Sequence, residues 1–100
     1  DDVRESPALD VMAVLDKKGA VVTYHDPFVP HLVGRDWPGQ RDMNSVPLSV
    51  DAIKNADCVV IITDHKSFDY DAIVRDAKLV VDSRNAIKTK HAHVFKLGAP

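Results

Sequence analysis

Cys58-Val59-Val60-Ile61-Ile62-Thr63 is apolar over its first five positions and shows no alternation of apolar and polar residues. A strand with this pattern is usually covered on both faces, which is typical of parallel sheets flanked by helices. Two later runs predict a second buried strand at 79–82 and a weaker strand at 94–97. An earlier β-branched and aromatic run predicts another strand at 20–25, and Asp26-Pro27 ends it.

Segments with helical signals lie before and between these strands. Ser6 can cap the free amides of a first helix, Pro7 suits its first turn, and Gly19 is a typical C-terminal stop. The predicted helices span 7–18, 49–56 and 69–76. Residues 28–47 hold three prolines and two glycines without a sustained period, so we expect a long loop there.

The order of these elements is helix, strand, loop, helix, strand, helix, strand, strand. Strands separated by helices imply right-handed crossovers, so the predicted fold class is α/β, with a three-layer, Rossmann-like, mostly parallel sheet flanked by helices. A doubly wound domain normally opens with a strand, whereas this sequence opens with polar residues and then a helix. We therefore expect the first strand to lie in sequence before Asp1, which would make residues 1–100 an N-terminally truncated fragment.

Composition excludes several classes of protein. One hundred residues allow one domain of ordinary size, and 45% apolar with 28% charged residues is typical of a globular chain. The formal net charge of −2 argues against binding to nucleic acid, and no apolar run approaches the ~20 residues that span a bilayer. The single cysteine fits a reducing compartment, so we expect a cytoplasmic protein that binds no membrane.

Polar clusters follow three of the predicted strands and precede the first helix. Ligands of open α/β sheets bind beyond the carboxyl ends of the strands, so we expect all four clusters along one edge. They are residues 2–6, 25–27, 63–66 and 82–85. Arg4 and Arg84 are the side chains best suited to a phosphorylated ligand, because a guanidinium can donate two parallel hydrogen bonds to phosphate oxygens.

Each cluster also has a purely structural interpretation. The charges at 2–5 could be a solvated tail. Asp26 could simply form a turn with Pro27. Arg84 could pair with Asp82 as a surface ion pair.

Other reactive residues are poorer candidates. Asp64 and His65 resemble a protease pair without a nucleophile elbow, which favours a turn or a cap. His91 and His93 are too few for a metal site, so no metal is expected. Cys58 begins the most apolar strand, so we expect an inert, buried thiol. The sequence also contains no GxGxxG phosphate loop, which counts against a self-contained dinucleotide site.

Taken in chain order, the clusters and their neighbours form a set of motifs. They are Asp2-Val3-Arg4-Glu5-Ser6-Pro7-Ala8-Leu9-Asp10, Gly19-Ala20-Val21 leading to Asp26-Pro27, Ala56-Asp57 before Val59-Val60-Ile61, Thr63-Asp64-His65 with Phe68-Asp69, and Val80-Val81-Asp82-Ser83-Arg84-Asn85. This ordered set resembles the C-terminal UDP-binding domain of the UDP-glucose/GDP-mannose dehydrogenase family over nearly the whole chain. The Thr63-Asp64-His65 motif is similar to that of the branch that oxidises UDP-N-acetylglucosamine or UDP-N-acetylmannosamine, and UDP-glucose is the alternative substrate.

The resemblance implies an NAD-dependent parent enzyme that oxidises the C6 hydroxyl of a UDP-sugar to a uronic acid. It implies that residues 1–100 are the UDP-sugar-binding C-terminal domain. The NAD-binding N-terminal domain, the central helical domain and the catalytic cysteine would then lie outside the sequence, so no catalytic residue is assigned and the fragment should be inactive alone. The parent would be a homo-oligomer, and products of this family commonly feed polysaccharide biosynthesis.

Two site residues carry over by motif. Arg4 matches the arginine that reaches toward the NAD cofactor, and Arg84 matches the arginine that binds the UDP-sugar. Both roles agree with the expected position of these side chains at the ligand-binding edge.

Two alternatives come from other classes. In a flavodoxin-like or receiver-like domain, Asp26 and Asp64 would gather around Mg²⁺ or be phosphorylated. A receiver-like domain would be expected to have a lysine after its last core strand, where this chain has Arg84-Asn85. The third possibility is a self-association domain that pairs through an exposed sheet edge.

Overall fold

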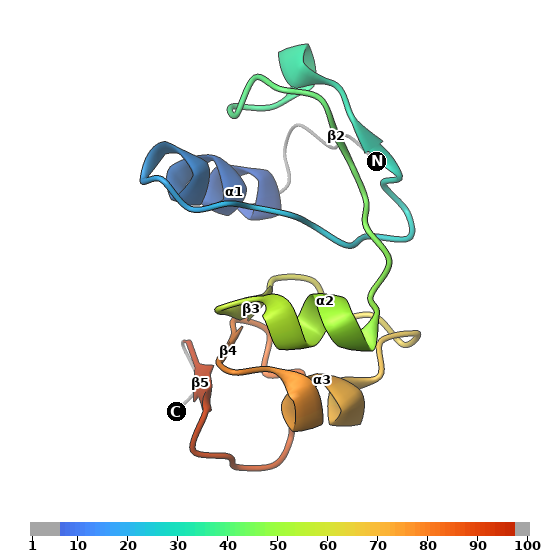
Figure 1. The fold of residues 1–100 in the computed structure, drawn as a ribbon, viewed down its shortest axis with the longest axis vertical. Helices are drawn as coiled ribbons and strands as arrows, with labels where there is room; N and C mark the ends of the chain where they lie inside the picture. Colours follow the sequence, from blue (N-terminus) through green and yellow to red (C-terminus); the bar gives the residue numbers. More distant parts are fainter. Residues whose placement is uncertain (1–6, 98–100) are drawn as a thin grey trace. The chain divides into compact units, whose positions relative to one another are not determined.

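The computed structural model describes residues 7–97, and the chain divides after Pro47 into two compact units, Asp1–Pro47 and Leu48–Pro100 (Figure 1). Each unit has its own cluster of buried apolar side chains. Among residues 7–97, no helix has both the length and the apolar character needed to cross a membrane. The first unit contains a helix and a hairpin, and the second contains a sheet.

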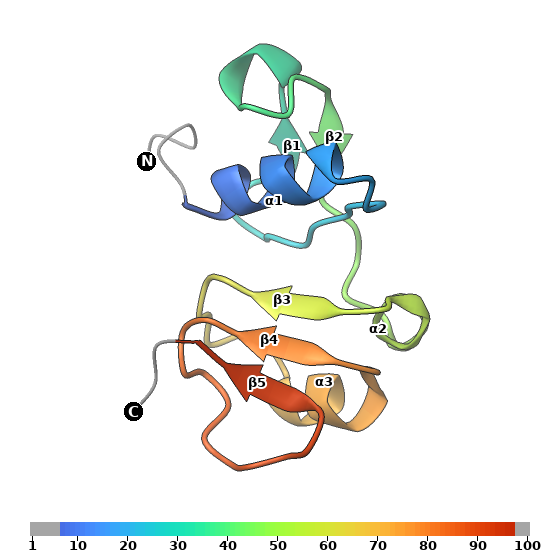
Figure 2. The same cartoon turned by 90° about the vertical axis from the view of Figure 1, so that its left-hand side faces the viewer.

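The sheet of the second unit is three-stranded and parallel. Its strands are β3 (Val59–Ile61), β4 (Val80–Asp82) and β5 (Val94–Lys96), in the order β3-β4-β5. Val80 on the central strand is in register with Val59 on one side and Val94 on the other. Figure 2 shows the three arrowheads pointing to the same edge. The prediction of parallel strands from three apolar runs is confirmed, although each strand is shorter than its run.

Two capped helices cover one face of these strands, and the second of them connects β3 to β4. They are α2 (Val50–Asn55) and α3 (Tyr70–Asp76). Ser49 caps α2 and Asp69 caps α3, each through a side-chain oxygen that accepts a hydrogen bond from the backbone N–H three residues on. The predicted helices at 49–56 and 69–76 are therefore confirmed, and so is the fold class: α/β, Rossmann-like, with a parallel sheet flanked by helices.

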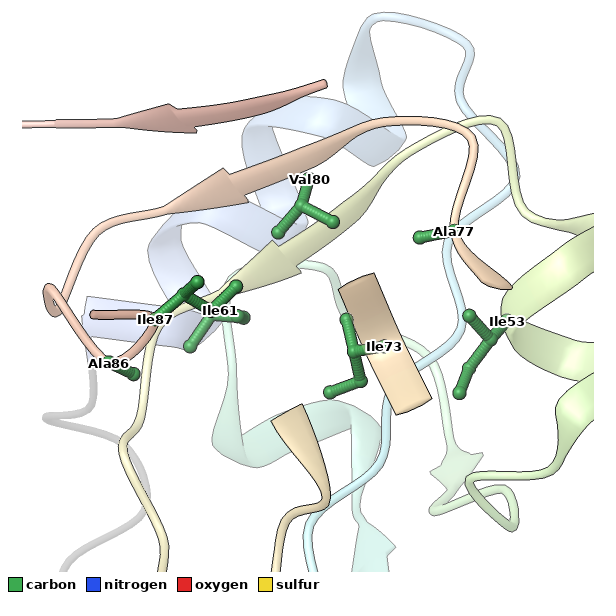
Figure 3. Close-up of a cluster of buried hydrophobic side chains, with 7 residues drawn as sticks. All are labelled: Ile53, Ile61, Ile73, Ala77, Val80, Ala86 and Ile87. Atoms are coloured by element: carbon green, nitrogen blue, oxygen red, sulfur yellow. The ribbon is translucent and has the colours of Figure 1, made fainter. Parts of the chain in front are cut away.

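The core of this unit lies between the helices and one face of the sheet. Figure 3 shows its buried members, which are Ile53, Ile61, Ile73, Ala77, Val80, Ala86 and Ile87. Residues alternate along a strand, so Val60 and Phe95 belong to the opposite face, where they remain 39% and 56% exposed. The expectation that the run at 58–63 is covered on both faces is therefore met on one face only.

The helix of the first unit is α1 (Pro7–Lys17), which confirms the prediction for 7–18 to within one residue. It ends where Gly19 adopts a φ of +96°, a conformation that glycine tolerates better than other residues. Leu9 and Met12 are its buried residues.

The segment 28–47 corrects the expectation of a loop without regular structure. It contains a short antiparallel hairpin, β1 (His31–Leu32) paired with β2 (Met43–Asn44), and a 3-10 turn, η2 (Gly34–Asp36), between them. Strands of two residues are too short to produce a readable alternation in the sequence.

Trp37 anchors this hairpin to the helix. Its side chain is only 4% exposed and packs in one cluster with Leu9, Met12 and Leu32. The indole N–H donates to the carbonyl oxygen of Arg41 at 2.6 Å, which closes the turn around the ring. The segment is thus built around a buried aromatic side chain.

Residues 20–25 are not a strand, so that prediction is wrong. Val22 and Tyr24 pack against the cluster of the first unit, while Val21 is 98% exposed, so the alternation of a strand is present. The N–H of Val46 donates to the carbonyl oxygen of Tyr24 at 2.8 Å, but no regular ladder continues from it within residues 7–97. A β-strand is defined by paired neighbours, and intrinsic propensity does not supply them.

Candidate functional site

The candidate site is the carboxyl edge of the sheet, defined here as the loop 62–69 after β3 and the loop 83–87 after β4. Both loops leave the same edge because β3 and β4 are parallel neighbours (Figure 2). Ser83 binds the second loop to the end of β3, since its backbone N–H and its hydroxyl both donate to the carbonyl oxygen of Ile61, at 3.0 and 2.7 Å. The structure therefore brings together two of the predicted polar clusters, 63–66 and 82–85.

Asp82 organises the loop after β4. Its side chain is completely buried. One carboxylate oxygen accepts from the backbone N–H groups of Arg84 and Ala86, at 3.0 and 3.1 Å, and the other accepts from that of Ile87 at 2.8 Å. Burial alone would raise the pKa of Asp82, but the N–H groups of Ile87, Ala86 and Arg84, together with the charge of Lys96, hold it below its usual value. Asp82 is therefore a buried carboxylate that stays ionised.

Arg84 is presented at the tip of this loop. Its side chain is exposed, and its guanidinium forms no ion pair within residues 7–97. The alternative of an Arg84–Asp82 ion pair is therefore wrong: the carboxylate binds the backbone of Arg84. Next to it, Asn85 adopts a left-handed φ of +52°, and the Lys88 ammonium donates to its carbonyl oxygen at 2.7 Å. The positive φ of Asn85 and the side chains of Asp82 and Lys88 thus fix the loop that carries the Arg84 guanidinium.

The loop after β3 is fixed by Tyr70, the first residue of α3. Its hydroxyl donates to the Asp64 carboxylate at 2.6 Å and accepts from the backbone N–H of His65 at 3.1 Å. Burial, followed by the hydrogen bond to Asp64, raises the pKa of Tyr70. Nothing in the sequence indicated this role, because the partners are separated by six positions across a turn.

The imidazole of His65 belongs to the same turn. The backbone N–H of Ser67 donates to its Nδ1 at 3.0 Å, so this nitrogen is an acceptor and the ring proton of the neutral form lies on Nε2. The Ser67 hydroxyl lies 2.6 Å from the same atom. These contacts support the interpretation of Asp64-His65 as a turn rather than a catalytic pair.

The predicted cluster at 25–27 lies in the first unit. Asp26 accepts from the backbone N–H of Phe28 at 2.8 Å, and its own N–H donates to the Ser45 hydroxyl at 2.9 Å. This geometry is the turn predicted as the structural alternative for Asp26. Arg4, the other predicted ligand-binding residue, lies outside the described residues.

Cys58 corrects the expectation of a buried thiol, because it is exposed. Partial desolvation nevertheless raises its pKa, which favours the unreactive thiol form. The Nε2 atom of His93 lies 2.7 Å from the carbonyl oxygen of Val74 and must donate to it, so this nitrogen cannot also bind a metal. Within residues 7–97, no three His, Cys, Asp or Glu side chains form a group that could hold a metal ion.

Comparison with known proteins agrees with the motifs. The model of the UDP-glucose/GDP-mannose dehydrogenase family, UDP binding domain, matches residues 1–89. A UDP-N-acetyl-D-mannosamine dehydrogenase from Methanococcus maripaludis strain C7 is 32% identical over 98 residues, which cover 88% of this chain and 20% of the relative. One from Methanococcus vannielii is 30% identical over 95 residues, which cover 87% of this chain and 20% of the relative.

The chain spans about a fifth of the length of these relatives. The comparison with solved structures gave no significant match. The predicted resemblance is confirmed by the family match, and the relatives agree with the predicted branch. This chain belongs to the UDP-glucose/GDP-mannose dehydrogenase family, within its UDP-binding domain.

Proposed function

We propose that this chain is the UDP-sugar-binding part of a longer NAD-dependent dehydrogenase that oxidises the C6 hydroxyl of a UDP-sugar to a carboxylate. The observation that carries the proposal is the loop 83–87. It presents an exposed guanidinium, that of Arg84, which forms no ion pair within residues 7–97, within the family motif Asp82-Ser83-Arg84-Asn85 and at the edge where open α/β sheets bind ligands.

In this proposal Arg84 binds the diphosphate or the sugar of the ligand. A guanidinium keeps its charge at every physiological pH and offers two parallel donors, which suits phosphate oxygens. The loop around it is already fixed by Asp82 and Ser83, so little conformational freedom is lost when the ligand binds.

The substrate we propose is a UDP-N-acetylhexosamine, with UDP-N-acetylmannosamine first because the relatives carry that name. NAD would accept the hydride, and it would be held mainly by parts of the longer protein, with Arg4 reaching toward it. The chain's own residues supply binding and orientation. A cytoplasmic location and a homo-oligomeric parent complete the proposal.

The test is a UDP titration of the chain, followed by backbone amide NMR. We expect weak binding, with a Kd on the order of millimolar, because one half of a cleft desolvates the diphosphate incompletely. Shifts should concentrate in 62–69 and 83–87. Arg84→Ala should weaken binding about ten- to a hundredfold, since a hydrogen bond to a charged group contributes about 1.5–3 kcal/mol.

The control is Arg35→Ala, which removes the same charge from an exposed position in the 3-10 turn of the first unit. It should leave the affinity for UDP unchanged. No shift with UDP, or equal losses from the two substitutions, would count against Arg84 as the ligand-binding residue. Reduction of NAD by this chain with any UDP-sugar would contradict the assignment of catalysis to other parts of the protein.

A further inference from the structure

Both oxygens of the Asp82 carboxylate bind groups of the protein itself. Its side chain has no exposed surface, and its two oxygens accept three backbone hydrogen bonds from the loop that follows. No side-chain cation within residues 7–97 forms a salt bridge with it, so its contacts are to main-chain donors. A buried carboxylate with this set of partners shapes the backbone around it.

The loop has two anchored ends and an exposed tip. Ser83 is tied to β3 through Ile61, and Ala86 and Ile87 are 8% and 3% exposed within the core shown in Figure 3. Between these anchors, Arg84 and Asn85 are the exposed residues.

The three donors of Asp82 come from both sides of the tip. The N–H of Arg84 precedes the left-handed residue Asn85, and the N–H groups of Ala86 and Ile87 follow it. One carboxylate thus holds the reversal of the chain that makes Arg84 project from the surface.

We propose that Asp82 is a positioning residue for recognition of the UDP-sugar: by binding the backbone on both sides of the tip, its carboxylate holds Arg84 in the orientation that meets the ligand. This inference rests on the proposed function, because it takes Arg84 as the residue that binds the UDP-sugar.

Only a carboxylate satisfies this arrangement. Asparagine has the same shape but one acceptor oxygen and one NH₂ group, so either rotamer sets a donor against a backbone N–H. Asp82→Asn should therefore loosen the tip while conserving side-chain volume. We expect it to weaken UDP binding roughly tenfold, as loss of one hydrogen bond to a charged acceptor implies.

The experiment is a double-mutant cycle on the chain, with Asp82→Asn, Arg84→Ala and both together, read by UDP titration in NMR. If Asp82 acts through Arg84, Asp82→Asn should weaken UDP binding to the otherwise unsubstituted chain, but it should have almost no further effect in a chain that already carries Arg84→Ala. Equal effects in both backgrounds, or no effect in either, would overturn the inference. The matched control is Asp51→Asn, the same substitution at an exposed position in the first turn of α2, outside both loops of the candidate site.

Hydrogen exchange separates the inference from the proposed function. Asp82→Asn should lower protection of the Arg84, Ala86 and Ile87 amides, and Asp51→Asn should not. Unchanged protection would overturn the inference even if UDP binds at Arg84. If UDP does not bind the unsubstituted chain, the proposed function fails. The part of the inference that concerns UDP recognition then fails with it, whatever the exchange data show.

A measurement on the unsubstituted chain covers the case in which Asp82→Asn does not fold. As the pH falls, protection of the Ala86 and Ile87 amides should decrease with the same midpoint as protonation of Asp82, followed by the ¹³C shift of its carboxyl carbon. Protection that persists after the carboxyl is protonated would show that other contacts hold the loop and would overturn the inference.

Discussion

The hydroxyl of Tyr70 donates a 2.6 Å hydrogen bond to the carboxylate of Asp64, and the same oxygen accepts the backbone N–H of His65. Because Tyr70 opens α3 and the other two residues follow β3, this one side chain joins the helix to the loop that precedes it. The loop at the candidate site is thus held by an aromatic side chain that need not touch a ligand.

Replacing Tyr70 by Phe should therefore loosen the loop 62–69 with little change in packing. We expect a loss of about 0.5–1.5 kcal/mol in the free energy of unfolding, since the exposed carboxylate of Asp64 can be solvated instead. Urea denaturation measures the loss, and hydrogen exchange at the His65 amide locates it. Tyr24→Phe is the control, because it removes a comparable hydroxyl bond, to the carbonyl of Val29, in the first unit. An equal rise in His65 exchange in both variants would contradict this role.

The buried carboxylate of Asp82 should make the second unit sensitive to acid. Its pKa is lower in the folded state than in the unfolded chain, so it contributes stability above the unfolded pKa of about 3.9, and that stability is lost as the pH falls through the folded pKa. Unfolding curves recorded as the pH falls from 6 into the acid range should show the decline. In Asp82→Asn the part of the acid-induced loss of stability that comes from Asp82 should be absent. The same pH dependence of stability in the unsubstituted chain and in Asp82→Asn would contradict the lowered pKa of Asp82.

Gly39→Ala should disturb the hairpin of the first unit. A Cβ at this position would overlap the indole ring of Trp37, so the ring would have to move out of its buried site. We expect a loss of about 1–3 kcal/mol in stability, typical of overpacking. Trp37 is the only tryptophan, so its fluorescence should shift to longer wavelength.

Gly19→Ala serves as the control for the hairpin experiment. Its added Cβ meets no atom within 4 Å, and the change only strains a positive φ. It should lower stability by about 1 kcal/mol and leave the tryptophan spectrum of the folded protein unchanged. A red shift in this variant, or none in Gly39→Ala, would show that the indole is not held as described.

Mg²⁺ separates the proposed function from a receiver-like role. Asp26 already accepts the N–H of Phe28, and Asp64 already accepts the hydroxyl of Tyr70. We therefore expect millimolar Mg²⁺, a concentration that would roughly saturate a weak carboxylate site, to produce no saturable amide shifts at either residue. Saturable shifts at both would favour the receiver-like alternative.

Much of the second unit could be predicted from sequence because its signals are local. Unbroken apolar runs around Val60 and Val81 indicated parallel strands, and Ser49 and Asp69 marked the helix starts that they cap. The first unit was harder. The run at 20–25 has the composition of a strand, but strand formation depends on a paired neighbour, which composition does not reveal.

The charged residue of the candidate site could be predicted from sequence, but the contacts that hold its loops in place could not. Arg84 could be named from the charge its motif places at a strand end. The support comes from Asp82, Ser83 and Tyr70, whose partners are backbone groups or distant side chains, and no sequence spacing specifies those contacts. The exposure of Cys58 was missed because hydrophobicity along the chain does not show which sheet face a helix will cover.

The positive φ of Asn85 has a consequence for how this protein can diversify. Only asparagine, aspartate and glycine adopt that conformation readily, so position 85 should stay restricted to them even if the sugar preference changes. New substrates would then be accommodated by varying side chains elsewhere, while the bend beside the guanidinium stays the same.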